Sequence, residues 1–127
     1  MALYRFRLEG KFKPCVRMTQ RSMHVDSQAQ QYLADKVEMG RQLKAQMAEN
    51  GWEMLAGQTP LVVDIRISRK AGFYNSDLDN MCKGILDAAS GIVYPDDRWI
   101  DCILAMRERG ERDMTWFQVQ TIGEGEA

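Results

Sequence analysis

The stretch LVVDIRIS at residues 61–68 decides the fold of this chain. Apolar side chains occupy every odd position, and polar side chains occupy the even positions from Asp64 onward. Such alternation is typical of a half-buried β-strand, because successive side chains of a strand point to opposite faces. Residues 3–9 (LYRFRLE) alternate in the same way and predict a second strand.

Two helices are predicted where apolar residues recur three and four positions apart. The longer helix begins near Ser27, whose spacing to Gln30 fits a capping box, and ends at about residue 50, before Gly51. The shorter helix covers about 78–90. We expect the longer helix to bury Ala29, Leu33, Val37, Gly40, Leu43 and Met47. We expect the shorter one to bury Leu78, Met81, Cys82, Ile85, Leu86 and Ala89.

Two further strands, at 99–107 and 114–122, flank a turn around Gly110. In the last strand, Phe117 and Val119 point inward. The order strand, helix, strand, helix, strand, strand predicts an α+β fold, a small four-stranded mixed sheet with two main helices packed on it. In the third strand we expect to find buried Ile100, Cys102, Leu104 and Met106.

The chain forms one predicted domain, residues 1–122, with a flexible tail at 123–127. Its 127 residues include one histidine and three scattered cysteines, which exclude a histidine-rich metal site and a disulfide framework. We therefore expect Cys82 and Cys102 to be core thiols of a cytoplasmic protein. With a single histidine, carboxylates and amines must supply most of any chemistry. No membrane span or secretory signal is evident.

The net charge of −1 hides an asymmetry along the chain. Residues 1–25 hold six basic residues and one acid, whereas the other 102 residues hold 11 basic and 17 acidic residues. A basic arm on an acidic body indicates a polyanionic partner that is contacted locally. A solvated strand face and loop would explain the same charges, and charge alone does not separate the two interpretations.

The carboxylates of residues 77–97 carry the functional signal. Asp79 and Lys83 lie four apart, so they share the polar face of the second helix. Asp77 can join Asp79 only from an extended position before the helix, and Asp97 begins the next strand. Each acid has a structural alternative: Asp77 as a helix cap, Asp79 with Lys83 as an exposed ion pair, and Asp97 as a turn residue.

Taken together, these acids are harder to explain structurally, because clustered carboxylates repel one another unless a cation or proton intervenes. Three carboxylates without imidazole or thiolate partners suit Mg²⁺, with Mn²⁺ as an alternative. Such an ion can activate water and neutralise the charge that develops on a phosphodiester. Lys83 could stabilise the same transition state.

At these residues the sequence resembles the RusA family of Holliday junction resolvases. The shared pattern, D-x-D-N-x-x-K…LDA…DD, is specific as a composite and covers about residues 61–106. It is carried by Asp77-Leu78-Asp79-Asn80, Lys83, Ile85-Leu86-Asp87-Ala88 and Val93-Tyr94-Pro95-Asp96-Asp97. The remainder of the chain fits the family by its order of elements.

The resemblance implies a homodimer that cuts four-way DNA junctions symmetrically with Mg²⁺. It assigns Asp77, Asp79 and Asp97 as the metal-binding and catalytic acids and Lys83 as the catalytic lysine. Two alternatives stay open: a general Mg²⁺-dependent nuclease for flaps or other branched DNA, and a non-catalytic dimer that binds junctions. The candidates for phosphate contacts are Lys11, Lys13, Arg17, Arg21, Arg66, Arg69 and Lys70.

Overall fold

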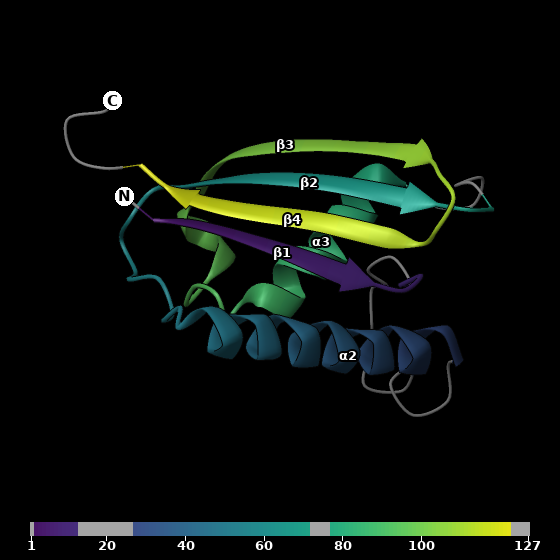
Figure 1. Cartoon of the computed structure of the whole chain (residues 1–127), viewed down its shortest axis with the longest axis horizontal. Helices are drawn as coiled ribbons and strands as arrows, with labels where there is room; N and C mark the ends of the chain where they lie inside the picture. The colour runs from purple at the N-terminus through teal and green to yellow at the C-terminus, as the bar shows by residue number, and fades with distance from the viewer. Residues whose placement is uncertain (1, 13–26, 72–76, 123–127) are drawn as a thin grey trace.

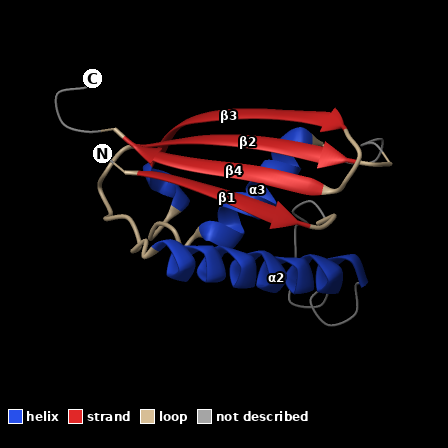
Figure 2. Ribbon diagram, in the orientation of Figure 1, coloured by secondary structure: helices blue, strands red, loops and turns tan. Residues whose placement is uncertain are grey.

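The computed structural model of this chain describes residues 2–12, 27–71 and 77–122. It confirms the predicted α+β fold, with the elements in the predicted order (Figures 1 and 2). No helix in these ranges is long and apolar enough to cross a membrane. The elements are β1 (Leu3–Glu9), α2 (Ser27–Asn50), β2 (Leu61–Arg69), α3 (Leu78–Ala89), the short 3₁₀ helix η1 (Asp97–Trp99), β3 (Ile100–Arg109) and β4 (Met114–Thr121).

The four strands form one mixed sheet in the order β1-β4-β2-β3. β4 is antiparallel to both of its neighbours, and β2 and β3 are parallel. As a result β1, β2 and β3 all point the same way and finish at the same end of the sheet (Figure 1). Residues that follow these three strands are therefore gathered at that end.

Both helices pack against one face of the sheet. That face is built by the odd-numbered residues of LVVDIRIS, all of them buried, together with the inward residues of β1 and β4. Burial of these apolar side chains drives the packing, at roughly 25 cal/mol per Å² removed from water. The facing helix residues include Met39, Leu43 and Met47 of α2 and Met81, Ile85 and Leu86 of α3. We call this side of the sheet the helix face and the other side the open face.

Two sequence expectations about α2 need correction. Val37 is 73% exposed rather than buried, and Leu33 is only half-buried. Tyr32 and Met39 occupy the interior instead. An α-helix has 3.6 residues per turn, so residues three and four positions after Ala29 both lie close to its face. The position of the sheet decides which of the two sets of residues is buried. The capping pair at Ser27 depends on a side chain outside the described residues.

A larger correction concerns β3. Cys102, Leu104 and Met106 were expected inside, but every residue from Asp101 to Arg109 is exposed. The register with β2 sets Leu104 beside Asp64 and Met106 beside Arg66, on the open face. The alternation correctly predicted a strand, but the apolar residues that it assigned to the interior lie on the open face. Since β3 is an edge strand, its helix-face residue Ile103 is also 48% exposed.

The outer edge of β1 is covered by two glutamines of α2. The side-chain amide of Gln46 accepts a hydrogen bond from the Arg7 N–H at 2.9 Å and donates one to the Arg7 carbonyl at 2.8 Å. Gln42 makes the same pair of bonds with Glu9, at 2.8 and 2.9 Å. Each amide thus replaces one peptide group of a neighbouring strand, and it satisfies backbone groups that an edge strand otherwise leaves unpaired.

Replacing Gln46 with Ala should lower the free energy of unfolding by about 1–2 kcal/mol, because both hydrogen bonds to Arg7 are lost together. Chemical denaturation of the variant measures this change. Lys44→Ala, an exposed substitution on the same helix, is the matched control and should unfold like the wild type. Equal stability of the two variants would show that the amide does not support the strand.

Candidate metal and DNA site

The start of α3 presents two acids to solvent. Asp77 occupies the N-cap position with an extended backbone (φ −86°, ψ 140°), as expected, and its side chain makes no capping hydrogen bond. Asp79 lies in the first turn, where its Oδ1 accepts a bond from the Asn80 N–H at 3.0 Å. Both side chains are exposed. A helix N-terminus favours negative charge, so the acids are tolerated here, but the capping alternative for Asp77 is not realised.

Lys83 and Asp87 follow Asp79 at intervals of four on the same face of α3. Among the described residues, ion pairs join Glu38 to Arg41, Asp64 to Arg66 and Asp96 to Arg98, so Asp79 and Lys83 do not form the exposed pair considered above. Asp87 accepts a hydrogen bond from the buried Tyr32 hydroxyl at 3.3 Å. α2 therefore positions the far end of this polar face.

The two adjacent acids before β3 have different environments. Asp96 caps η1, where its side chain accepts from the Arg98 N–H at 2.9 Å, and this bond lowers the pKa of Asp96. Burial raises the pKa of Asp97, helped by a hydrogen bond with Asp96 and by the charges of Asp87 and Asp96. Lys83 acts in the opposite direction and lowers that pKa. Asp96 is thus held by the local structure, whereas Asp97 belongs to a repulsive acidic cluster.

The acids fall into two groups along α3. Asp77 and Asp79 are at its start, and Asp97 lies near Asp87 in its second half. Asp79 and Asp87 are separated by eight residues, about 12 Å along the helix axis. Within the described residues of one chain, no three acids, cysteines or histidines are close enough together to hold a metal ion. Lys83 lies between the two groups.

Cationic residues gather at the end of the sheet where α3 begins. Lys11 follows β1 and Lys70 follows β2, and both are exposed. Because β1 and β2 point the same way, these lysines and Asp77 share one end of the molecule. Three other candidates for phosphate contacts, Lys13, Arg17 and Arg21, lie outside the described residues.

Arg69 does not match its predicted role. It is only 4% exposed, and its Nη1 donates a hydrogen bond to the Ser68 carbonyl at 3.1 Å. Burial lowers its pKa, while the nearby charge of Asp113 acts in the other direction. This burial removes Arg69 from the candidates for phosphate contacts and makes it a packing residue.

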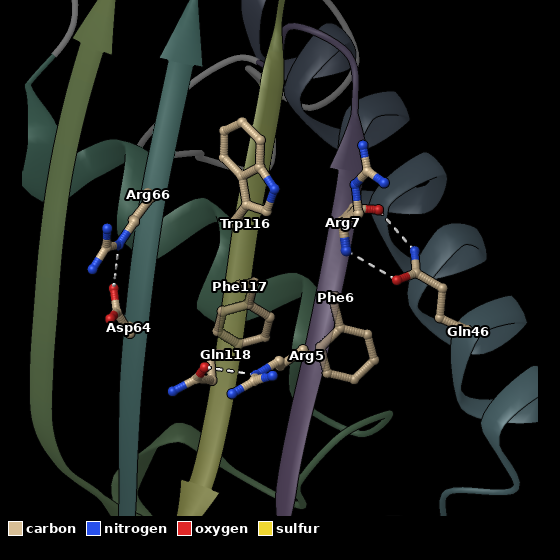
Figure 3. Close-up of a pocket in the computed structure, with 9 residues that line it drawn as sticks. All are labelled: Arg5, Phe6, Arg7, Gln46, Asp64, Arg66, Trp116, Phe117 and Gln118. Carbon is tan, nitrogen blue, oxygen red and sulfur yellow. Dashed lines mark hydrogen bonds and ion pairs between the residues drawn. The ribbon is translucent and has the colours of Figure 1, made fainter.

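The open face carries a basic and aromatic surface, of which only Arg66 was among the candidates predicted from the sequence (Figure 3). The register sets Trp116 of β4 between Arg7 of β1 and Arg66 of β2. Trp116 is 39% exposed, and these residues line a hollow of about 390 Å³ with Arg5 and Gln118. Arg66 also pairs with Asp64 at 3.5 Å. The sequence did contain a signal for this surface, because Arg5 and Arg7 occupy outward positions in the strand predicted at residues 3–9.

Exposed acids and a lysine along one helix, with cations at the same end, are the kinds of side chain that a metal-assisted, phosphodiester-cleaving enzyme uses. The family model described as endodeoxyribonuclease RusA matches residues 9–115. The chain therefore belongs to the RusA family, and it is an endodeoxyribonuclease of the Holliday junction resolvase type. No curated protein matches the chain significantly.

Arg69→Ala should lower the free energy of unfolding by at least about 1 kcal/mol, because the buried stem and the bond to Ser68 are both lost. Its affinity for DNA, measured on the folded protein, should not change. Lys70→Ala should do the reverse: it keeps the wild-type stability but reduces the salt dependence of DNA binding by about one phosphate contact. Weaker DNA binding by Arg69→Ala at wild-type stability would contradict these assignments.

Proposed function

We propose that this enzyme resolves Holliday junctions by paired, symmetric nicks, with Asp77, Asp79 and Asp97 as ligands of a catalytic Mg²⁺. One observation carries the proposal: Asp77 and Asp79 are both exposed at the start of one helix, and no ion pair within the described residues joins either to a cation. Uncompensated like charges favour a bound cation. The raised pKa of Asp97 has the same cause in part, because Asp87 and Asp96 repel its charge.

The donor atoms fit a hard ion. All three proposed ligands are carboxylates, which suit Mg²⁺ and Mn²⁺ rather than a soft metal. Cys82, the nearest thiol along α3, is buried, and burial and the charge of Asp79 raise its pKa. A thiolate ligand is therefore disfavoured. When bound, the ion would supply a nucleophilic water and offset the charge on the phosphate.

The remaining chemistry falls to Lys83 and to the acids that surround it. Lys83 is exposed on the polar face of α3, within electrostatic reach of Asp97. An ammonium group there can stabilise the phosphorane-like transition state or the departing oxygen, since both carry developing negative charge. Asp87, whose carboxylate accepts a hydrogen bond from Tyr32, lies one turn beyond Lys83 on the same face of α3.

Binding of branched DNA would begin with its phosphates. Lys11, Lys70 and Arg66 are exposed, and Lys13, Arg17 and Arg21 add to the basic segment after β1. These cations offset the repulsion between DNA and a chain whose net charge is −1. A DNA substrate inside the cell also accounts for our assignment of the enzyme to the cytoplasm.

A homodimer follows from the symmetry of the substrate. Two nicks related by a two-fold axis require two active sites related by the same axis. A monomer would have to dissociate and rebind between the nicks, which would allow a half-cut junction to escape. We therefore propose that the dimer is the active form.

Asp77→Asn, Asp79→Asn and Asp97→Asn should each lower the nicking rate of a synthetic four-way junction by at least about 100-fold, because each removes an anionic ligand of the ion. Junction affinity should stay equal or increase, since each change removes one negative charge. Nicking assays with Mg²⁺ or EDTA and gel-shift titrations measure the two effects. Asp35→Asn on α2 is the matched control and should cut normally.

Several outcomes would contradict the proposal. Wild-type turnover by Asp97→Asn would show that Asp97 is not a ligand. Cutting of flaps as fast as junctions would indicate a general nuclease for branched DNA. Junction binding without cutting under any divalent metal would indicate a binding protein rather than an enzyme.

A further inference from the structure

Four residues on the open face of the sheet lie side by side, one on each strand. The register sets Arg7 of β1 beside Trp116 of β4, Trp116 beside Arg66 of β2, and Arg66 beside Met106 of β3. All four residues are exposed, and neither helix lies over them, because α2 and α3 pack on the helix face (Figure 1). We call these four residues the open-face row.

Trp116 differs from the other two tryptophans in the surroundings of its ring. Trp52 stacks on Tyr4 with 4.6 Å between the ring centroids, and the guanidinium of Arg98 lies 5.7 Å from the ring centroid of Trp99. Within the described part of the chain, no aromatic ring or guanidinium stacks on Trp116, which is 39% exposed. Its ring is therefore available to stack with a planar group of a ligand.

The hollow around Trp116 carries an excess of positive charge. Three arginines line it, Arg5, Arg7 and Arg66, and Asp64 is the one acid among its lining residues. Arg66 pairs with Asp64 at 3.5 Å, and no ion pair within the described residues involves the other two arginines. Figure 3 shows the Trp116 ring with Arg66 on one side and Arg7 on the other. Such a surface attracts an anion to the immediate neighbourhood of the ring.

We propose that the open-face row binds an unpaired nucleotide of a DNA strand, with the base stacked on Trp116 and the phosphates on either side of it held by Arg7 and Arg66. This site is separate from the acids of α3, which lies on the helix face. The inference needs DNA as a ligand, which membership of an endodeoxyribonuclease family supplies. It depends neither on a bound metal nor on the number of subunits.

The dimensions of the hollow suit a single nucleotide. Its volume of about 390 Å³ falls in the lower part of the range for small-molecule sites, roughly 300–1,000 Å³. Arg7 and Arg66 are on strands two positions apart in the sheet, so their backbones are about 10 Å apart. Their long side chains can thus reach phosphates on both sides of a base that lies on Trp116 between them.

The combination of groups selects an unpaired nucleotide over other anions. In a duplex, each base is already stacked between its neighbours and paired, so its face is not free for Trp116. An acidic peptide or a free phosphate would match the arginines, but neither brings a planar group to the exposed ring. Met106, 48% exposed beside Arg66, offers a flexible apolar contact for a second base.

The position of the row relates it to the rest of the enzyme. Lys70 follows Arg66 by four residues, about 13 Å of strand, at the end of the sheet where Asp77 also lies. An unpaired strand on the row can therefore continue into a duplex arm whose phosphates contact that end. This step rests on the proposed function, and it predicts a preference for branched DNA that carries an unpaired strand.

Fluorescence anisotropy with a labelled oligothymidylate, in EDTA so that no strand is cut, tests the stacking contact. Trp116→Leu keeps an apolar side chain but removes the aromatic face, and it should lower the affinity at least about fivefold. The dependence of affinity on salt should stay unchanged, because no phosphate contact is lost. Trp116→Phe is the matched variant and should keep most of the affinity.

The phosphate contacts have a different signature in the same assay. Arg7→Ala should weaken binding and reduce the slope of log affinity against log salt by about 0.7, the value for one phosphate contact on a single strand. Arg41→Ala removes an exposed arginine of α2 that pairs with Glu38, so it is the matched control. It should bind the oligothymidylate like the wild type.

Photocrosslinking of the wild-type protein locates the base without any substitution. A single-stranded oligonucleotide that carries one 5-iododeoxyuridine should crosslink to the peptide that contains Trp116, as identified by mass spectrometry. The same oligonucleotide annealed to its complement should give no crosslink at this peptide, because its bases are then paired.

Several outcomes would overturn the inference. These are wild-type affinity of Trp116→Leu for the oligothymidylate, an equal loss of affinity for a linear duplex, and a crosslink that maps elsewhere. A change in mass by light scattering with unchanged DNA binding would make this face a contact between copies of the chain. If the oligothymidylate binds and crosslinks as expected but the wild-type enzyme cuts no junction, the proposed function fails and the open-face site stands.

Discussion

The structure depends on a sheet that is buried on one face only. The apolar alternation of β2 and the matching residues of β1 and β4 create a single hydrophobic face, and α2 and α3 cover it. Both helices lie on the same side of the sheet, so the open face stays exposed, and β3 at the edge of the sheet is exposed as well. Protection at the other edge comes from Gln42 and Gln46, whose amides satisfy the backbone of β1. The two edges therefore differ: side chains of α2 cover β1, whereas β3 pairs only with β2 among the described strands.

The same topology distributes the charges. Since β1, β2 and β3 finish at one end, the residues that follow them place Lys11, Lys70 and Asp77 close to the start of α3. A DNA phosphate approaching that end meets both cations and acids, which is the combination that a metal-assisted nuclease requires. Asp97 lies before β3, at the opposite end of that strand from the residues that follow it.

Much of this fold could be predicted from local patterns. Alternation in LVVDIRIS and in residues 3–9 identified two strands, and the apolar spacing of residues 78–90 identified α3, because strand and helix periods differ strongly. The metal-site candidates also came from local signals, namely the D-x-D-N-x-x-K spacing and the final pair of acids. Burial was harder to predict from the sequence than secondary structure: Arg69 was expected at the surface, yet it is buried. A single sequence does not show which face of an element is covered.

The sequence by itself determined the elements, their order and the chemical character of the site, since propensity, period and residue type are properties of short segments. Only the tertiary structure decided that β3 lies at an edge, with Leu104 and Met106 outside. It also decided that Asp97 lies near the second half of α3 rather than beside its start. Both facts depend on the strand order β1-β4-β2-β3, which arises from contacts between residues far apart in the chain. No local pattern encodes such contacts, because the free energy that selects them comes from burying the whole face at once.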